Sequence, residues 1–176
     1  MTHGPLFLDL AERPGSMEKV DLDDVSQAPL SGAADRRDVS AALGATDVAV
    51  IYYELEPGEA FSGGFHAHLD QEELFLVLEG RATWDTEAGE AAVTVGAGEA
   101  VRFAPGEFQH GYNDSGDVVR ALALGAPPGM DETVARFRCP ACGERGDHDV
   151  DLDEERGITI TECRACGNEI RTDLGD

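Results

Sequence analysis

Histidine and glutamate side chains with metal-ligand spacing stand near the middle of the chain. His66 and His68 are one residue apart, Glu73 follows shortly after them, and His110 comes much later. Alternate side chains of a β-strand point to the same face, so His66 and His68 can share one ion. Glu73 begins the next apolar run and His110 belongs to a separate hairpin, as convergence on one ion requires. We therefore expect a metal centre made of these four side chains, with Glu73 as the candidate catalytic proton acceptor.

The ligand types narrow the choice of ion. Three imidazoles and one carboxylate leave two positions open in an octahedral shell, which suits Fe(II), Mn(II), Ni(II) or Co(II), while Zn(II) would also be accepted. Glu72 is an alternative to Glu73 as the carboxylate ligand. Histidines that only pack in the core are the alternative to a metal centre.

Four cysteines near the end of the chain form a second set of ligands. They occur as two pairs with two residues inside each pair and a glycine after each: Cys139 and Cys142, then Cys163 and Cys166. The twenty residues between the pairs leave room for a hairpin with a return strand at 158–161, so this segment resembles a zinc ribbon. Four thiolates close the shell of a structural zinc, which should supply most of the ribbon's stability. Two disulfides are the alternative, although nothing in the sequence indicates export.

The chain is strongly acidic. It has 36 acidic and 13 basic side chains, a formal charge of −23, and one lysine, Lys19. This composition, with its single lysine, resembles that of cytoplasmic proteins from haloarchaea, and an ordinary acidic protein is the alternative. Molar salt shortens the Debye length to about 3 Å and screens the self-repulsion of such a surface. Such a surface lacks the basic contacts that nucleic acid and anionic membranes require. With no leader and no run of about 18 apolar residues, we expect a soluble cytoplasmic protein.

Short apolar runs separated by turn residues fill the middle of the chain. They lie at residues 48–53, 74–78, 82–84, 91–95, 100–103 and 118–124. Short strands at regular spacing predict an all-β sandwich or barrel. We expect four parts: an acidic N-terminal arm at 1–45, the barrel at 46–127, a linker at 128–136 and the ribbon at 137–176. A short helix is expected over residues 131–137.

The histidine segments resemble the two motifs of the cupin family. The first motif, His-x-His, three or four residues, Glu, six residues, Gly, is met by His66, His68, Glu73 and Gly80. The second motif, Gly-x5-Pro-x-Gly-x2-His-x3-Asn, has its counterpart in Gly98, Pro105, Gly106, His110 and Asn113. In this second segment three residues separate Gly106 from His110, and two separate His110 from Asn113.

The resemblance implies a double-stranded β-helix, or jelly-roll barrel, with the ion inside it. Because this fold hosts many reactions, the resemblance implies two kinds of function. One is a metal-dependent enzyme, dioxygenase- or isomerase-like, that acts on a small organic molecule. The other is a non-catalytic module that binds a small ligand or a metal and docks to a partner protein through the ribbon. Relatives of such barrels are commonly dimers, so we expect a homodimer.

Overall fold

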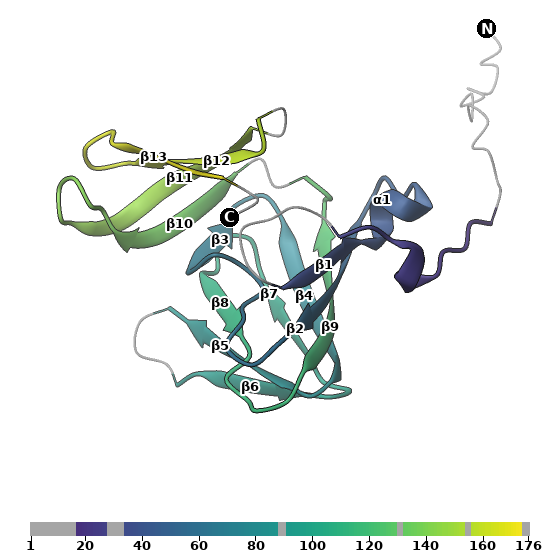
Figure 1. Ribbon diagram of the computed structural model, residues 1–176. Coiled ribbons are helices and arrows are strands. Elements are labelled where there is room, and N and C mark those ends of the chain that lie inside the picture. Colours follow the sequence, from purple (N-terminus) through teal and green to yellow (C-terminus); the bar gives the residue numbers. More distant parts are fainter. Residues whose placement is uncertain (1–16, 28–33, 88–90, 130–131, 154–155, 174–176) are drawn as a thin grey trace, which may run out of the picture.

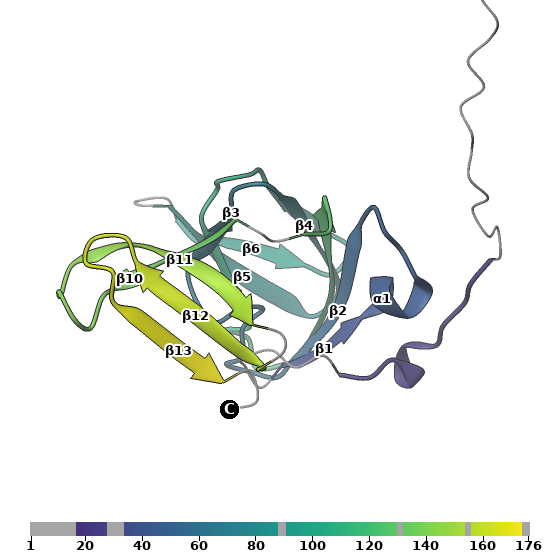
Figure 2. The same cartoon turned by 90° about the horizontal axis from the view of Figure 1, so that it is seen from above.

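Two antiparallel sheets surround a common core in the computed structural model of the chain (Figures 1 and 2). The structure describes residues 17–27, 34–87, 91–129, 132–153 and 156–173. The first sixteen residues of the expected arm lie outside the described residues. No helix of the described part is long and apolar enough to span a membrane.

The first sheet has five strands in the order β1-β2-β9-β4-β7. They are β1 (Asp35–Asp38), β2 (Ala49–Leu55), β9 (Val119–Ala126), β4 (Glu72–Glu79) and β7 (Ala100–Phe103). In β9, Val119, Ala121 and Ala123 are buried, whereas the residues between them are partly exposed. This alternation is typical of a sheet that rests one face on the core.

The second sheet has eight strands and runs from the barrel into the C-terminal ribbon in the order β13-β12-β11-β10-β3-β8-β5-β6 (Figure 1). Its barrel strands are β3 (His66–His68), β8 (Gln109–Tyr112), β5 (Arg81–Thr86) and β6 (Val93–Gly96). Its ribbon strands are β10 (Thr133–Arg138), β11 (Arg145–Asp153), β12 (Ile158–Cys163) and β13 (Glu169–Asp173). The predicted all-β architecture, a jelly-roll barrel with a small ribbon, is confirmed.

The segments that flank the barrel are more regular than expected. Residues 133–137 form a strand in place of the expected helix, because β10 hydrogen-bonds to β3 on one side and to β11 on the other, and residue 131 lies outside the described residues. The expected linker at 128–136 therefore contains the start of a strand. Tertiary pairing overrides the weak local preference of this segment.

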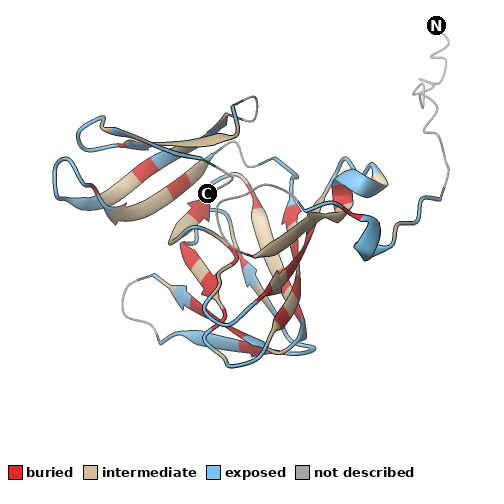
Figure 3. Ribbon diagram, viewed as in Figure 1, coloured by how far each residue is buried: buried red, intermediate tan, exposed pale blue. Residues whose placement is uncertain are grey.

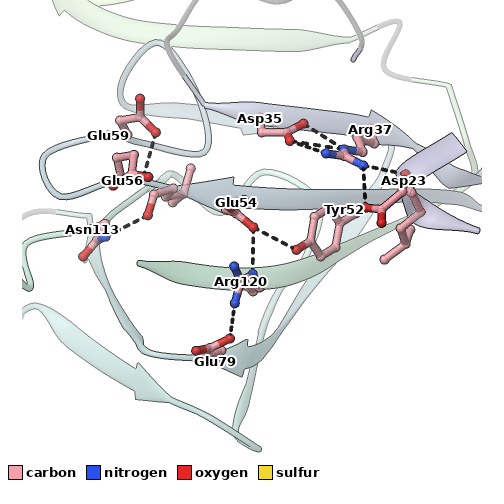
Figure 4. A network of polar contacts seen from close by, with 12 residues as sticks. Asp23, Asp35, Arg37, Tyr52, Glu54, Glu56, Glu59, Glu79, Asn113 and Arg120 are labelled. Atoms are coloured by element: carbon pink, nitrogen blue, oxygen red, sulfur yellow. Dashed lines mark hydrogen bonds and ion pairs between the residues drawn. The ribbon is translucent and has the colours of Figure 1, made fainter. Parts of the chain in front are cut away.

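The described part of the expected N-terminal arm also carries regular structure. It holds a 3-10 helix, η1 (Leu22–Asp24), then β1 and the short helix α1 (Val39–Leu43). The sequence of β1 has no apolar alternation, and pairing with β2 holds it at the sheet edge. Arg37 adds ion pairs to Asp35 and Asp23 (Figure 4).

Buried residues lie on strands of both sheets (Figure 3), and aromatic side chains are prominent in the core cluster between them. Trp84 is fully buried and stacks on Phe61 with 5.2 Å between ring centroids. Phe75 lies against both rings, at 5.1 Å from Phe61 and 5.3 Å from Trp84. Since Phe75 and Val77 of β4 are buried, Glu73 two residues before Phe75 faces the same interior.

Two motif residues prove to be structural. Gly80 has φ +74°, and a β-carbon there would collide with the Val118 carbonyl oxygen. Asn113 is fully buried and donates hydrogen bonds to the carbonyls of Leu55, at 3.0 Å, and Asp117, at 2.8 Å. The asparagine therefore fixes the turn after β8 to the end of β2.

Gly111 lies against the aromatic core, where there is no room for a larger side chain. A β-carbon at this position would overlap the indole of Trp84 and the ring of Phe61. We expect Gly111→Ala to lower the free energy of unfolding by about 1–3 kcal/mol through overpacking, seen as a lower urea midpoint at unchanged m-value. Gly116→Ala is the matched control, because its added methyl group meets nothing within 4 Å. Equal midpoints for the two variants would contradict the packing described.

Candidate metal centre

Three of the expected ligands meet inside the barrel. Donor atoms of His66 and His68, from β3, and of Glu73, from β4, all lie within 4.8 Å of one another. His68 Nε2 is 3.8 Å from Glu73 Oε2, and the two imidazole centroids are 5.1 Å apart. Two imidazoles and a carboxylate at this separation have the chemistry and the geometry to hold one divalent ion.

Polar contacts of the Nδ1 atoms fix the orientation of both imidazoles. His66 Nδ1 lies 2.9 Å from the Gly64 carbonyl oxygen and 3.2 Å from the Ser62 hydroxyl, and His68 Nδ1 lies 2.9 Å from the Thr133 hydroxyl. A carbonyl oxygen only accepts, so His66 Nδ1 carries the proton and its Nε2 presents a lone pair. Such outer contacts are the usual means of orienting histidine ligands.

Burial shifts the pKa values of His66, His68 and Glu73 and so decides which of them are charged. It raises the pKa of Glu73 to about 7 and, together with the neighbouring His66, lowers the pKa of His68 to about 4. The pKa of His66 is also lowered, mainly by burial. Near neutral pH both rings are therefore neutral and ready to ligate, while the Glu73 carboxyl is close to half ionised.

The alternative carboxylate points away from this group. Glu72 lies on the outer side of β4, where it forms an ion pair with Arg102. Glu73 instead stands in register with Phe103 of β7 and Gly125 of β9. The structure thus favours Glu73 over Glu72, as the interval to the motif glycine indicates.

His110 does not join the three residues. It lies in β8 opposite Asp85, and its ring packs beside Tyr112 with 5.3 Å between centroids. The next position, Gly111, faces the core against Trp84, so strand alternation turns His110 to the outer face. The four-residue centre expected from the sequence is a three-residue group in the structure.

Gln109 takes the inward position instead. It pairs in register with His66, so both side chains lie on the same face of the sheet. Its Nε2 is 3.0 Å from Glu73 Oε2 and 3.3 Å from His66 Nε2. The residue is 2% exposed, and its Oε1 is buried without a hydrogen-bond partner in the described part of the chain.

The second motif contains a signal for this exchange. The motif requires two residues between its glycine and its histidine, which after Gly106 places the histidine at position 109. Three further residues lead to Asn113, as the motif also requires. Both intervals are irregular for His110 and regular for Gln109. Counting the intervals, without demanding the residue type, identifies the inward side chain.

A narrow hollow lies beside the three residues. Its walls come from β3, β4, β8 and the turn after Phe103, and they include Gln71, Glu107 and Gln109. The gap is too small for a water molecule. Any ligand larger than an ion therefore needs a wall side chain to move.

The four cysteines of the ribbon form a separate cluster. Their sulfur atoms lie within 4.8 Å of one another, and Cys139 Sγ is 3.8 Å from Cys166 Sγ. All four are free thiols and not two disulfides. Each pair forms the same tight turn, closed by hydrogen bonds from Gly143 N to Cys139 O at 2.9 Å and from Gly167 N to Cys163 O at 2.8 Å. The cluster fits a zinc ribbon.

The surroundings of Cys139 favour its thiolate form. Backbone N–H groups of Cys142 and Ala141, with the side chain of His148, lower the pKa of Cys139 to about 6. His148 is fully buried and stacks on Phe137 with 3.8 Å between ring centroids. Its Nδ1 lies 2.9 Å from the Gly146 carbonyl, which fixes the ring beside the cluster. No spacing or motif in the sequence indicates that this histidine supports the ribbon.

Comparison with known proteins gives the family of the barrel and its fold relatives. The cupin domain family model matches residues 51–125. The structure is similar to that of a sugar phosphate isomerase from a cupin superfamily from Silicibacter pomeroyi, with TM-score 0.56 and 18% identity over 89% of this chain and 92% of that one. It is also similar to the polyketide cyclase RemF from Streptomyces resistomycificus, with TM-score 0.55 and 21% identity over 79% and 89% of the two chains.

A third similar structure is that of a predicted oxalate decarboxylase from Thermotoga maritima, with TM-score 0.53 and 17% identity over 62% of this chain and 99% of that one. No curated protein matches the chain. Likeness at these identities shows the fold alone, and the named activities of these proteins differ. The family match and the two wrapped sheets agree: residues 51–125 of this chain are a cupin domain, and a four-cysteine ribbon continues one of its sheets.

Proposed function

We propose that the barrel is the divalent-metal centre of an enzyme that acts on a small organic molecule. The observation that carries this proposal is the convergence of one donor atom each from His66, His68 and Glu73 within 4.8 Å. The outer contacts to Gly64 and Thr133 aim both rings at one point. Two histidines and one carboxylate on one side of an ion leave positions for a substrate.

The residues around the centre divide the chemical tasks. A bound Fe, Mn, Ni, Co or Zn ion supplies Lewis acidity, and a redox-active one also serves oxygenase chemistry. His66 and His68 would hold the ion as neutral ligands, and Phe103 lines the hollow beside them. Glu73 Oε2 is the atom that can hold a proton near neutral pH. These properties support a dioxygenase- or isomerase-like reaction, with Glu73 as ligand and candidate proton acceptor.

The substrate class follows from the chemistry of the centre. Hard divalent ions bind oxygen atoms, and the hollow admits a substrate only after a wall side chain has moved, which favours a small molecule over a large one. Two proteins of similar structure are named for a sugar phosphate isomerase and a predicted oxalate decarboxylase, which act on oxygen-rich compounds by their names. Oxalate and glucose 6-phosphate are therefore the first compounds to test.

A non-catalytic binding module is the second candidate. The observation that favours it is the pairing of His68 with Thr133 of β10, which leads directly into the ribbon. A ligand-dependent change at His68 would thus reach the ribbon, through which the module would dock to a partner protein. Turnover of a small oxygen-rich compound by the metal-loaded protein, absent in His66→Ala, favours the enzyme. Ligand binding without turnover favours the module.

Metal content tests the two metal sites together. We expect purified protein to contain about two divalent ions per chain, one in the barrel and one zinc in the ribbon. His66→Ala combined with His68→Ala should remove only the barrel ion. Cys139→Ser combined with Cys142→Ser should remove only the zinc and expose the ribbon to proteolysis. Elemental analysis of the three proteins measures this, and an unchanged content in the histidine variant would contradict the barrel centre.

Ion binding to the barrel should depend on pH through Glu73. Burial raises the pKa of Glu73 to about 7, so below that pH an incoming ion must displace a proton. The affinity for Co(II) should therefore fall about tenfold for each pH unit below 7 and level off above it. The low pKa of His68, about 4, keeps that ring neutral over this range.

Calorimetry in buffers of different ionisation enthalpy measures the released proton. About one proton per ion is expected near pH 6 and almost none near pH 8. Glu73→Gln should abolish the dependence while weakening binding. A flat affinity between these pH values in the unaltered protein would show that Glu73 does not ligate.

We also propose that two copies associate through the outer face of the five-stranded sheet. Two rows of apolar side chains cross this face in register: Val50, Leu124 and Leu74 form one, and Tyr52, Leu122 and Leu76 the other. Beside them Arg120 bridges Glu54 and Glu79 (Figure 4). An apolar centre with a charged rim is typical of protein interfaces.

Molar mass at high salt tests this interface. Each copy carries a formal charge of −23, so association should strengthen as salt screens the repulsion. We expect the mass of a dimer by light scattering at about 2 M salt, and the mass of a monomer for Leu122→Arg under the same conditions. A dimer that persists in Leu122→Arg would place the interface elsewhere.

A further inference from the structure

We propose that Gln109 binds the barrel cation through Oε1 and that its side-chain amide must first rotate to bring this oxygen to the cation. The inference rests on the metal centre proposed above and goes beyond it. It concerns a residue type that differs from the histidine of the family motif. Its evidence is the set of contacts around a single amide group.

The hydrogen bonds fix which end of the amide faces the centre. His66 Nδ1 donates to the Gly64 carbonyl, so His66 Nε2 is an acceptor. Glu73 Oε2, when ionised, is an acceptor as well. The group that faces both atoms, at 3.3 and 3.0 Å, must therefore be the NH2 group of Gln109. The amide oxygen then points away, buried and without a hydrogen-bond partner among the described residues.

The amide NH2 group and a cation compete for the same lone pairs. A cation in the centre needs His66 Nε2 and Glu73 Oε2, the two atoms to which the Gln109 amide nitrogen now points. Both cannot be satisfied at once, and a cation beside NH2 hydrogens would be repelled. Binding therefore requires the amide to leave or to turn.

Turning is the smaller change. Rotation about the last side-chain bond exchanges Oε1 and Nε2 with no shift of the backbone, which β3 fixes through the pairing of Gln109 with His66. It brings the amide oxygen to the side of the cation and gives the buried, unpaired oxygen a partner. An unpaired buried acceptor is unfavourable, so the cation satisfies the oxygen, while the NH2 group gives up its contacts to His66 and Glu73. The hollow beside Gln109 is the space that the movement changes.

Glutamine in place of the motif histidine changes the set of ligand atoms in the centre. With Gln109, the protein supplies two nitrogen and two oxygen ligands, whereas a histidine at position 109 would supply three nitrogens. Amide oxygen is a harder ligand than imidazole, and it suits Mn(II), Fe(II) and Co(II) better relative to Cu(II), Ni(II) and Zn(II). We infer that Gln109 shifts the metal preference of this barrel toward the harder ions.

Leucine at position 109 separates a ligand from a mere competitor. Co(II) binding is titrated with the full chain while the ribbon holds zinc. If Gln109 ligates, Gln109→Leu weakens Co(II) binding about tenfold or more. If its amide only competes for the lone pairs, the same variant binds Co(II) more tightly. Tighter or unchanged binding overturns the proposal. His110→Gln, on the outer face, is the matched control and should change the affinity by less than about twofold.

Counting nitrogen ligands gives an independent measurement. Pulsed electron paramagnetic resonance of the Cu(II)-loaded barrel should show two coordinated imidazoles in the unaltered protein and in His110→Gln. Gln109→His should show three, with Zn(II) affinity raised about tenfold or more over that for Mn(II). Two imidazoles in Gln109→His, or three in the unaltered protein, overturn the proposal. This measurement tests the proposal even if Gln109→Leu fails to fold, because it does not use that variant.

The result also separates this inference from the proposed function. Absence of any Co(II) binding besides the ribbon metal overturns both. Binding that depends on His66 and His68 but not on Gln109 overturns only the role of the amide. Urea midpoints of the variants within the scatter of the unaltered protein exclude misfolding as the cause.

Discussion

The pairing of β3 with β8 is the constraint on which the metal centre depends. His66 and Gln109 stand opposite each other, and strand alternation fixes every other side chain from that pair. His66 and His68 then face the interior, and His110 faces outward beside Tyr112. A shift of β8 by one residue would exchange Gln109 for His110 and would also drive the Tyr112 ring toward the space that Gly111 leaves for Trp84. The aromatic core thus selects the amide over the imidazole.

The same sheet links the two candidate metal sites. β10 pairs with β3 through Thr133 and with β11 through Val150, so the barrel and the ribbon share one set of hydrogen bonds. Thr133 also contacts the ring of His68. The ribbon itself has few buried apolar side chains, and zinc between its thiolates would supply the stability that its core lacks. Loss of either metal should therefore destabilise β10.

Much of this arrangement could be predicted from the sequence. Alternation and turn residues gave the barrel strands, and cysteine spacing gave the ribbon cluster. The interval between Glu73 and Gly80 selected the carboxylate that the structure places beside His66 and His68. Local patterns failed where long-range pairing decides: β10 was expected as a helix, and β1 has no apolar alternation. His110 was chosen by residue type, although the direction of a side chain depends on its parity in the strand, which Gln109 satisfies.

The most direct test of the account is the position of a cation in the folded chain. Crystals of the protein loaded with Mn(II), measured at a wavelength where manganese scatters anomalously, should show a peak between His66 Nε2, His68 Nε2 and Glu73 Oε2, with Gln109 Oε1 turned toward it. A peak confined to the four cysteines, or a barrel cation held by His110 instead, would contradict the account.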